Sequence, residues 1–264
     1  MHKHQNRTCN SIDISIITPF YRGNKYISGL LDILKSNVQN MTDSSVKMEY
    51  ILVNDSPDTK IEYDKTLRYP FDIRCFTNKK NLGVHATRCE GIRRARGKYI
   101  VMLDQDDRLD KNWLNEQWRA VKNNDLVISN ALYCQKHVNY VAYKNEEEMR
   151  SYCNKWAMCF KGNKIISPGQ VLIKKNIIPK IWMKYQMKNN GADDYLLWIL
   201  LFEKKCRVAY NPQTFYYHSY SVESISHRSN LMRRSEAEMA ELICRYHLTN
   251  IVRRIIYRAR YIKN

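Results

Sequence analysis

A cluster of carboxylates follows directly on an apolar run near the middle of the sequence. Residues 99–103 are apolar, and Asp104, Asp106 and Asp107 come immediately after them. Carboxylates cannot follow a strand into the core, so they must meet water, a metal ion or a ligand. An Asp-x-Asp pair can hold a hard divalent cation, which commonly bridges a protein to a nucleotide diphosphate. The alternative is a solvated turn, which Asp also favours.

Two further polar clusters follow apolar segments nearer the start of the chain. Residues 13–18 and 49–53 are short, apolar and rich in β-branched side chains, which predicts two strands. Pro19 is expected to end the first strand, and residues 19–22 (Pro-Phe-Tyr-Arg) form the first cluster. Residues 54–57 (Asn-Asp-Ser-Pro) form the second, a turn whose side chains can hydrogen-bond their own backbone.

The remaining segments of the first half alternate between helical and strand patterns. Asn24 is expected to cap a helix, and residues 84–96 are expected to form another, closed by Gly97 in the left-handed conformation. The inner face of the first helix carries Ile27, Leu30, Leu31 and Leu34. Residues 73–76 and 125–129 are further predicted strands. This alternation predicts an α/β fold with a mostly parallel sheet and helices on both faces.

The three polar clusters fall at the carboxyl ends of predicted strands. In a parallel α/β sheet these ends share one edge, and ligands bind beyond that edge. No G-x-G-x-x-G follows the first strand and no G-x-x-x-x-G-K-[ST] occurs, so neither type of glycine cradle for phosphates is present. The convergence of the clusters therefore predicts a ligand site that is built from side chains.

The chain is strongly basic, and the charge is concentrated toward its end. Among 264 residues, 44 Lys and Arg stand against 26 Asp and Glu, which gives a formal charge of +18. Such a charge suits polyanions: nucleic acid, an anionic membrane surface or phosphate-bearing substrates. Residues 227–264 hold nine Arg and Lys against three Glu.

Residues 227–264 also carry apolar side chains at helical spacing. They are Leu248, Ile251, Val252, Ile255, Ala259 and Ile262. A basic amphipathic helix is typical of a membrane-surface anchor. The alternative is a terminal helix that packs on the domain and has a solvated basic face.

Composition limits the class of protein. Hydrophobic residues make up 44% of the chain, which predicts one large globular domain with a terminal appendage. The longest apolar runs, such as residues 195–202, are too short to span a bilayer, and no cleavable signal is recognised. The eight cysteines form no C-x-x-C pair, so we interpret them as reduced thiols. We expect a cytoplasmic protein, placed on the inner face of the membrane if the tail is an anchor.

Four sequence blocks resemble glycosyltransferase family 2, whose members have the GT-A fold. The blocks are SIITPFYRGNKYI (residues 15–27), ILVNDSPD (51–58), NKKNLGVHATRCEGIRRARGKYIVMLDQDDRL (78–109) and GADDYLLWILL (191–201). They occur in the family's order and approximate spacing and together cover most of the chain. The resemblance implies a Rossmann-like GT-A domain that performs an inverting sugar transfer from a nucleotide-sugar donor.

The resemblance implies a nucleotide site at the first two clusters and the helix after them. Pro19 and Tyr21 match the place of an aromatic that packs on the base, and Asp55 matches an acid that contacts the base. Arg88 matches an arginine that is directed at the nucleotide, and Asp104 matches an acid that faces the ribose or a metal-bound water. The implied donor is a nucleotide-diphosphate sugar, with a UDP-sugar favoured.

The resemblance also implies a divalent cofactor, Mg²⁺ or Mn²⁺. Asp106 matches the direct metal ligand of the family's Asp-x-Asp motif, and Asp107 is an accessory candidate. His218 matches a histidine near the metal or the diphosphate, and the alternative is a packed histidine. The cation would neutralise charge that develops on the departing nucleoside diphosphate.

A catalytic base is implied in the acidic pair that precedes the apolar helix at residues 195–202. Asp194 matches the base, which takes the proton of the acceptor hydroxyl as its oxygen attacks the anomeric carbon. Asp193 stands where Glu is commoner in the family and is an accessory candidate. The alternative is that both carboxylates only cap the helix and interact with its dipole.

The combined interpretation is a metal-dependent inverting glycosyltransferase of surface polysaccharide synthesis. Residues 13–110 are expected to bind the nucleotide, and residues 111–226 the acceptor, a hydroxyl of a glycan or lipid-linked acceptor. Residues 1–12 are expected to be a flexible N-terminus, and residues 227–264 a basic helical tail that contacts an anionic membrane; no nucleic acid partner is expected.

Two alternatives stay open. One is a basic membrane- or polyanion-binding protein with an inactive transferase-like domain. The other is a nucleotidyltransferase, which would want a glycine-rich loop after the first strand, where this chain has Pro19, Phe20 and Tyr21.

Overall fold

The computed structural model of the chain describes residues 11–134, 139–219 and 229–262. Most of the expected flexible N-terminus (residues 1–12) and the expected boundary between residues 226 and 227 lie outside these ranges. The strands are β1 (Ile14–Phe20), β2 (Met48–Asn54), β3 (Asp72–Thr77), β4 (Tyr99–Met102), β5 (Arg108–Leu109), β6 (Leu126–Cys134), β7 (Asn139–Val141), β8 (Val171–Lys174) and β9 (Val208–Ser219). The α-helices are α1 (Asn24–Gln39), α2 (Val84–Arg94), α3 (Trp113–Val121), α4 (Glu146–Tyr152), α5 (Lys155–Lys161), α6 (Lys180–Lys184), α7 (Asp193–Glu203), α8 (Ser229–Arg245) and α9 (Ile251–Tyr261). Two short 3₁₀ helices are η1 (Pro168–Gln170) and η2 (Lys175–Ile177).

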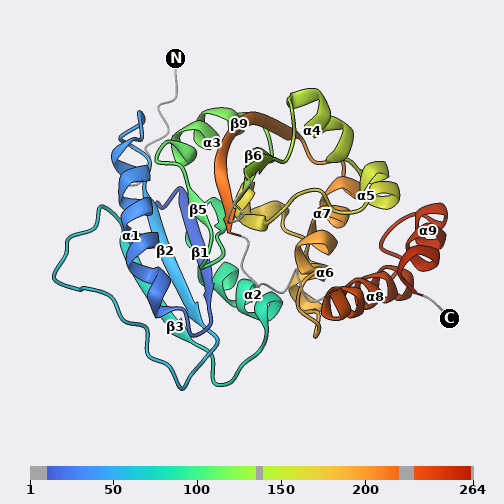
Figure 1. Cartoon of the computed structure of the whole chain (residues 1–264), viewed down its shortest axis with the longest axis horizontal. Helices are drawn as coiled ribbons and strands as arrows, with labels where there is room; N and C mark the ends of the chain where they lie inside the picture. Colours follow the sequence, from blue (N-terminus) through green and yellow to red (C-terminus); the bar gives the residue numbers. More distant parts are fainter. Residues whose placement is uncertain (1–10, 135–138, 220–228, 263–264) are drawn as a thin grey trace, which may run out of the picture.

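The nine strands of the described residues form one sheet in the order β3-β2-β1-β4-β8-β6-β9-β5, with β7 on β6 (Figure 1). Strands β3, β2, β1 and β4 are parallel, as predicted. Helix α1 makes the crossover from β1 to β2, α2 the one from β3 to β4, and the long loop of residues 55–71 the one from β2 to β3. Beyond β4 the sheet is mixed: β8 is antiparallel to both of its neighbours, and only β6 and β9 are parallel. Four residues separate β6 from β7, and such a short connection permits only antiparallel pairing.

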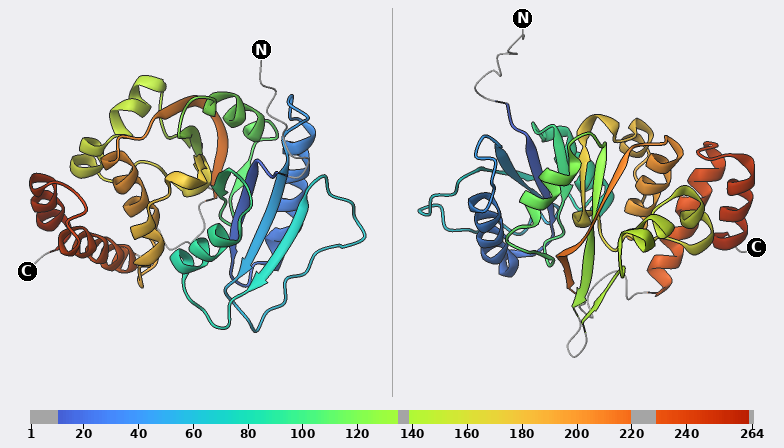
Figure 2. Two further views of the ribbon diagram at one scale, coloured as in Figure 1. Left: turned by 180° about the vertical axis from the view of Figure 1, so that it is seen from behind. Right: turned by 90° about the horizontal axis from the view of Figure 1, so that it is seen from above.

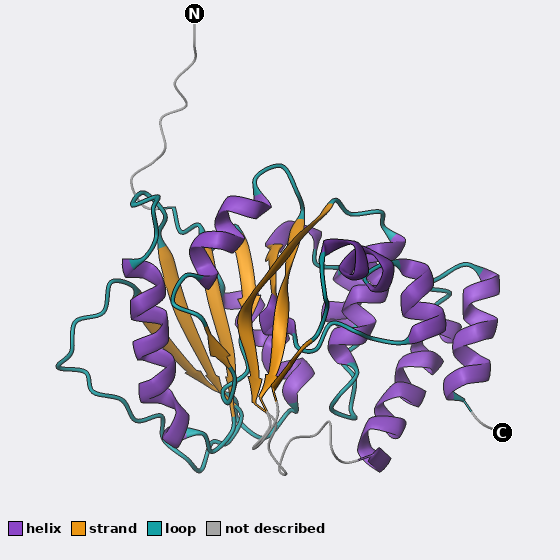
Figure 3. Ribbon diagram, turned by 45° about the horizontal axis from the view of Figure 1, so that its top comes forward, coloured by secondary structure: helices purple, strands orange, loops and turns teal. Residues whose placement is uncertain are grey.

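Helices cover both faces of the sheet, as Figure 3 shows, and the strand residues alternate between the two layers. On β4, Ile100 and Met102 pack in the layer that contains α2, α5, α6 and α7. Val101 and Leu103 pack on the opposite face with α1 and α3. Helix α7 is buried from Asp193 to Phe202, as expected for a helix that is apolar all round. This burial fixes the first turn of α7 against the sheet.

Two predicted details at the start of the chain are wrong. Strand β1 continues through Pro19, which pairs in register with Val53, and ends at Phe20. Helix α1 begins at Asn24 and buries the predicted apolar face, but its N-cap is Gly23. The Asn24 side chain instead donates to the Lys60 carbonyl at 2.9 Å. Asn24 therefore fastens the long connection between β2 and β3. A local sequence pattern cannot reveal this contact, because Lys60 is distant from Asn24 in the sequence.

The predicted end of the second helix is also wrong. Helix α2 ends at Arg94 with Ala95 as its C-cap, and Gly97 does not adopt the left-handed conformation. Glycine is required at position 97 for a different reason, because a Cβ there would lie 2.5 Å from the backbone nitrogen of Ser15. The Gly97 N–H also donates to Ser15 Oγ at 2.8 Å. The backbone at Gly97 thus lies in close contact with the start of β1, just before the chain enters β4.

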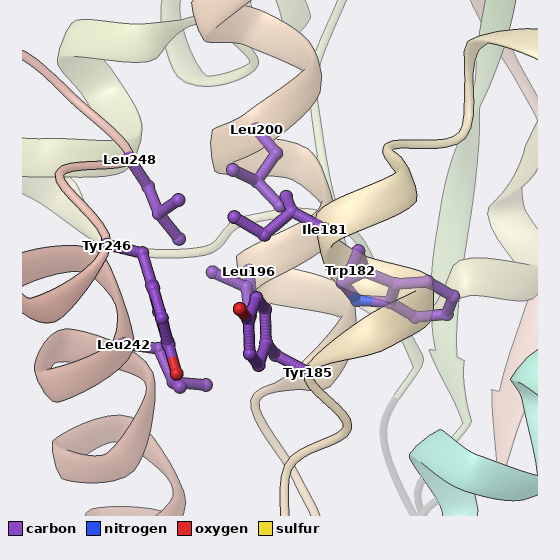
Figure 4. Close-up of a pocket in the computed structure, with 8 residues that line it drawn as sticks. All are labelled: Ile181, Trp182, Tyr185, Leu196, Leu200, Leu242, Tyr246 and Leu248. Carbon is purple, nitrogen blue, oxygen red and sulfur yellow. The ribbon is translucent and has the colours of Figure 1, made fainter.

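The basic tail forms α8 and α9, which lie at the end of the molecule farthest from β3 in both views of Figure 2. Helix α8 packs on α6 and α7 across an apolar crevice (Figure 4), in which the rings of Tyr185 and Tyr246 stack with centroids 4.1 Å apart. The other residues of the crevice are Ile181, Trp182, Leu196, Leu200, Leu242 and Leu248. Within the described ranges, no helix is long and apolar enough to cross a membrane.

We predict that Gly97→Ala lowers the free energy of unfolding by about 2 kcal/mol or more, because the added methyl meets backbone that cannot move aside. Gly29→Ala in α1 is the matched control, since a Cβ there meets nothing within 4 Å. It should raise stability by about 0.5–1 kcal/mol. Urea unfolding measures both changes, and equal effects of the two substitutions would contradict the close approach at Gly97.

Candidate active site

The predicted polar clusters meet at one edge of the sheet. Tyr21 follows β1, Asp55 follows β2, and Asp104 follows β4 after one further residue, at the carboxyl ends of adjacent parallel strands. The short strand β5 then pairs with β9, with Arg108 opposite Tyr217. This pairing brings the end of β9, with His218, beside the acid cluster. The convergence that strand order predicts is therefore present.

Asp107 is buried and organises the end of β9. Its carboxylate accepts hydrogen bonds from the Tyr216 hydroxyl and from the Ser219 N–H at 2.9 Å. It also lies 3.0 Å from Nδ1 of His218. Nδ1 of the imidazole is thereby engaged, which leaves Nε2 as the nitrogen that could meet a cation or a phosphate.

Asp104 is joined to the same network through a serine. Ser167 Oγ lies 3.1 Å from Asp104 Oδ2 and 2.7 Å from the Tyr216 hydroxyl. The 3₁₀ helix η1, which follows Ser167, is fastened to β6 by Gln170, whose Nε2 donates to the Ser129 carbonyl at 2.6 Å. The acid cluster is thus held by hydroxyl groups from two distant segments.

Asp106 differs from its neighbours because no cationic or hydroxyl side chain of the described residues pairs with it. Burial and the charges of Asp107 and Asp104 raise its pKa to about 6. A crowded carboxylate of this kind gains from a cation.

Within the described ranges, no three His, Cys, Asp or Glu side chains converge at metal-binding distances. Mg²⁺ and Mn²⁺ commonly take only one or two protein ligands and complete their shells with phosphate oxygens and water. Asp106 and Nε2 of His218 are the groups at this edge that could hold such a cation.

The middle residue of the Asp-x-Asp motif ties the acid cluster to the loop after β1. Gln105 accepts from the Tyr21 N–H at 3.0 Å and donates to the Tyr21 carbonyl at 3.2 Å. A Cβ at Gly23 would lie 2.2 Å from the same Gln105 side chain. The ring of Tyr21 is exposed at the rim of the site. The motif thus holds this aromatic next to the acid cluster through its backbone.

Asp55 is buried and fastens the loop before α2. Its carboxylate accepts from Asn78 Nδ2 at 2.8 Å, from the Leu82 N–H at 2.8 Å and from the Gly83 N–H at 2.9 Å. Gly83 has a positive φ of 86°, which favours glycine at this turn. A carboxylate can accept about four hydrogen bonds, so one position remains for a ligand. The contact of Asp55 with a base stays a prediction.

Arg88 lies between the two acidic parts of the site. Its guanidinium, in a residue only 5% exposed, donates to Asp104 Oδ1 at 2.6 Å and to Asp193 Oδ2 at 2.7 Å. Burial alone would lower the pKa of Arg88, but the charges of Asp104 and Asp193 outweigh it, so the pKa lies above its usual range. The guanidinium therefore bridges α2, β4 and α7, a role that the sequence did not indicate.

The acidic pair Asp193 and Asp194 occupies the first turn of α7, whose N-cap is Ala192. Neither carboxylate is the N-cap, although both lie where a negative charge interacts favourably with the helix dipole. Burial raises the pKa of Asp193, but Arg88 and His85 outweigh this and the net shift is downward. For Asp194, burial and the adjacent Asp193 charge raise the pKa to about 7.

Asp194 has few partners. Its Oδ1 accepts from the Tyr195 N–H at 2.7 Å, and its Oδ2 lies 3.3 Å from Asn163 Nδ2. A carboxyl group that titrates near neutrality and faces one long, replaceable hydrogen bond suits a general base. The shared Arg88 places this group next to the acid cluster.

Four residues of the site were not singled out from the sequence: Gln105, Asn163, Ser167 and Tyr216. For Tyr216 a signal existed, because residues i and i+2 of a strand face the same side and His218 was already a candidate. For the other three, the partner lies far away in the sequence. Only the packing of the segments reveals these contacts.

Comparison with known proteins identifies relatives in sequence. The Glycosyl transferase family 2 profile matches residues 15–182. An uncharacterized glycosyltransferase of Methanocaldococcus jannaschii is 29% identical over 174 residues, which cover 63% of this chain and 58% of the relative. The minor teichoic acid biosynthesis protein GgaB of Bacillus subtilis is 33% identical over 98 residues, which cover 36% of this chain and 10% of the relative. The chain therefore matches little more than half of the first relative and a small part of the second.

Comparison with solved structures gives the fold. The crystal structure of S. aureus TarS (residues 1–349) in complex with UDP-GlcNAc superposes with a TM-score of 0.65 at 16% identity. The match covers 94% of this chain and 71% of TarS. It confirms the predicted α/β fold class, a GT-A sheet flanked by helices.

We predict that Tyr216→Phe lowers the free energy of unfolding by about 1–3 kcal/mol, because it removes the hydroxyl that serves buried Asp107. Tyr217→Phe is the matched control on the opposite face of β9, and its effect should stay within about 0.5 kcal/mol. Urea unfolding of both variants tests this. Equal stability of the two proteins would contradict a buried hydroxyl network at the acid cluster.

Proposed function

Because the chain belongs to glycosyl transferase family 2, we propose that it is a metal-dependent inverting glycosyltransferase that acts on a nucleotide-diphosphate sugar. The observation that carries this proposal is the link from Asp194 through Asp193 and Arg88 to Asp104. The link places a carboxyl group of near-neutral pKa beside an acid cluster that suits a metal and a diphosphate.

The donor is proposed to bind at the edge formed by β1, β2 and β4. Tyr21, preceded by Pro19, would pack on the base, and Asp55 would accept a hydrogen bond from it. Asp104 would face the ribose, and Arg88, which donates to Asp104 at 2.6 Å, would be directed at the nucleotide from the same side. The TarS complexes with UDP and with UDP-GlcNAc support a UDP-sugar as the donor.

Asp106 and Nε2 of His218 are the groups that we propose as metal ligands. Asp107 holds the His218 ring by its Nδ1, as carboxylates commonly do for histidine ligands. A bound Mg²⁺ or Mn²⁺ would stabilise negative charge on the leaving diphosphate. The chain's own contribution is to hold the His218 ring through Asp107, whose carboxylate accepts from the Tyr216 hydroxyl.

Asp194 is proposed to be the catalytic base. The acceptor hydroxyl would replace Asn163 at Asp194 Oδ2 and lose its proton there while its oxygen attacks the anomeric carbon. The bond to the diphosphate breaks on the opposite face, which inverts the configuration. Asp193 stays ionised against Arg88, and its charge keeps the proton affinity of Asp194 high.

The acceptor is proposed to be a hydroxyl of a glycan or lipid-linked glycan in surface polysaccharide synthesis, which the relationship to GgaB supports. Residues 13–110 would bind the donor and residues 111–226 the acceptor. A lipid-linked acceptor would be met at the inner face of a membrane, and the basic tail would hold the enzyme there.

We predict that Mn²⁺ together with one of the UDP-, GDP-, CMP- or dTDP-sugars raises the melting temperature by about 3 °C or more at roughly tenfold excess over Kd. Asp106→Asn should remove the metal-dependent part of this shift. The exposed Asp64→Asn is the control and should retain it. Thermal-shift measurements with and without Mn²⁺ decide the matter. The donor proposal is wrong if no nucleotide stabilises the protein in the presence of metal.

We predict that kcat/KM for release of nucleotide from the stabilising donor, with water as acceptor, rises about tenfold per pH unit and levels off near pH 7, because Asp194 must be ionised. Asp194→Asn should lower kcat by about a thousandfold. Asp64→Asn should leave the pH profile unchanged. If kcat/KM of the wild-type enzyme does not change between roughly pH 5 and 8, the assignment of Asp194 as the base is contradicted.

The stability of the Asp194→Asn variant shows whether the substitution removes catalysis or disrupts the fold. The folded-state pKa of Asp194 lies above its unfolded value, so the wild-type protein loses stability as the pH rises through about 7. Asn at this position carries no charge. Above about pH 7, the inactive variant Asp194→Asn should therefore be at least as stable as the wild type.

A further inference from the structure

Helix α9 packs on the rest of the molecule through its polar and aromatic side. Arg253 is buried and donates to both oxygens of Glu203, at 2.5 and 2.6 Å, and Tyr257 is buried beside it. Farther along the helix, Arg260 donates to the carbonyl of Phe160 at 2.6 Å. These contacts fix the rotation of α9 about its axis.

The apolar side of α9 consequently faces outward. Ile251, Val252 and Ile255 are 64%, 51% and 61% exposed, and Ala259 is exposed one turn further on. Of the two arrangements expected from the sequence, packing on the domain is present, and the membrane anchor stays a prediction. The helix packs on the domain, but the face that meets solvent is the apolar one. Contiguous exposed apolar surface of this kind marks an interaction site.

Basic side chains border this face, and exposed aromatic rings lie on the neighbouring helix α5. Arg254 and Arg258 follow it along one side of α9, at helical spacing. On the neighbouring helix α5, Trp156 and Phe160 are both exposed and stack on each other, and the Arg253 guanidinium lies 4.9 Å from the Trp156 ring. Arginines and aromatic rings beside an exposed aliphatic stripe are typical of a helix that lies in the interface of a membrane.

We infer that the outward face of α9 docks on an anionic lipid surface, with Ile251, Val252 and Ile255 entering the interface and Arg254 and Arg258 meeting lipid phosphates. The positive charge beside this face favours an anionic membrane over a second copy of the chain as its partner. Two copies that joined at this face would bring their arginines together on proteins of formal charge +18, whereas anionic lipids neutralise them. The inference names the surface by which the protein would bind the membrane, and it rests on the proposed function, which supplies the reason for membrane binding.

The geometry agrees with a docking role. Helices α8 and α9 lie at one end of the molecule, and α9 is the outermost element there (Figures 1 and 2). The ion pair of Arg253 with Glu203 and the crevice contacts of α8 fasten the tail to α7, whose first turn carries Asp194. A membrane bound at α9 would therefore be held at a fixed orientation to the proposed base.

Vesicle sedimentation with the full chain tests the inference. We expect binding to phosphatidylcholine vesicles that contain phosphatidylglycerol, weaker binding at high salt, and little binding to phosphatidylcholine alone. Combining Ile251→Ser, Val252→Ser and Ile255→Ser should weaken binding by about tenfold or more, because the side chains that enter the interface are lost. Arg254→Gln with Arg258→Gln should weaken binding to the anionic vesicles only.

Leu67→Ser with Val141→Ser is the matched control, since both side chains are about half exposed on other parts of the surface. This variant should bind vesicles like the wild type. The inference is overturned if the wild type does not bind anionic vesicles, if the triple variant binds them unchanged, or if the apolar face instead drives concentration-dependent dimerisation in sedimentation velocity.

The thermal shift with donor and Mn²⁺ separates this inference from the proposed function. If the triple variant loses vesicle binding and keeps the donor shift, both stand. If the wild type shows the donor shift without vesicle binding, only the docking surface is refuted. Vesicle binding without any donor shift would refute the proposed function and leave the docking surface in place.

Discussion

A buried arginine joins the two acidic parts of the candidate active site, and the rest of the site depends on it. Arg88 on α2 is bonded to Asp104 after β4 and to Asp193 at the start of α7. A buried charge without a partner is strongly destabilising, whereas one that is paired and hydrogen-bonded can be kept. The fold therefore requires these three segments to meet, and their meeting brings the acid cluster and the base candidate together.

The same arginine separates the proton affinities of the acidic pair. Asp193 is held ionised by Arg88, while Asp194, with the charge of Asp193 next to it, keeps its proton to near neutral pH. When their surroundings push the pKa values of two neighbouring carboxylates apart, the two groups can take different roles in one site. The proposed division between a positioning carboxylate and a base follows from this arrangement and not from either residue type alone.

Much of the site edge could be predicted from the sequence because simple rules govern it. Apolar runs that end in polar residues mark strand ends, and parallel strands bring those ends to one side. The Arg88 bridge could not be predicted, since it depends on how α2 packs against α7. The role of Gly97 was also hidden, because the backbone of Ser15, which excludes a side chain there, is distant in sequence. The spacing of apolar residues marked α9 as amphipathic, but only the burial of Arg253 determined which side faces outward.

A double-mutant cycle on Arg88 and Asp193 tests the central claim most directly. The free energy of unfolding is measured by urea for the wild type, Arg88→Met, Asp193→Asn and the double variant. If the buried pair unites the site, Arg88→Met leaves Asp193 without its cation and Asp193→Asn leaves Arg88 with Asp104 alone, and the coupling energy is about 2 kcal/mol or more. Effects that add within about 0.5 kcal/mol would show that Arg88 and Asp193 act independently and would contradict the account.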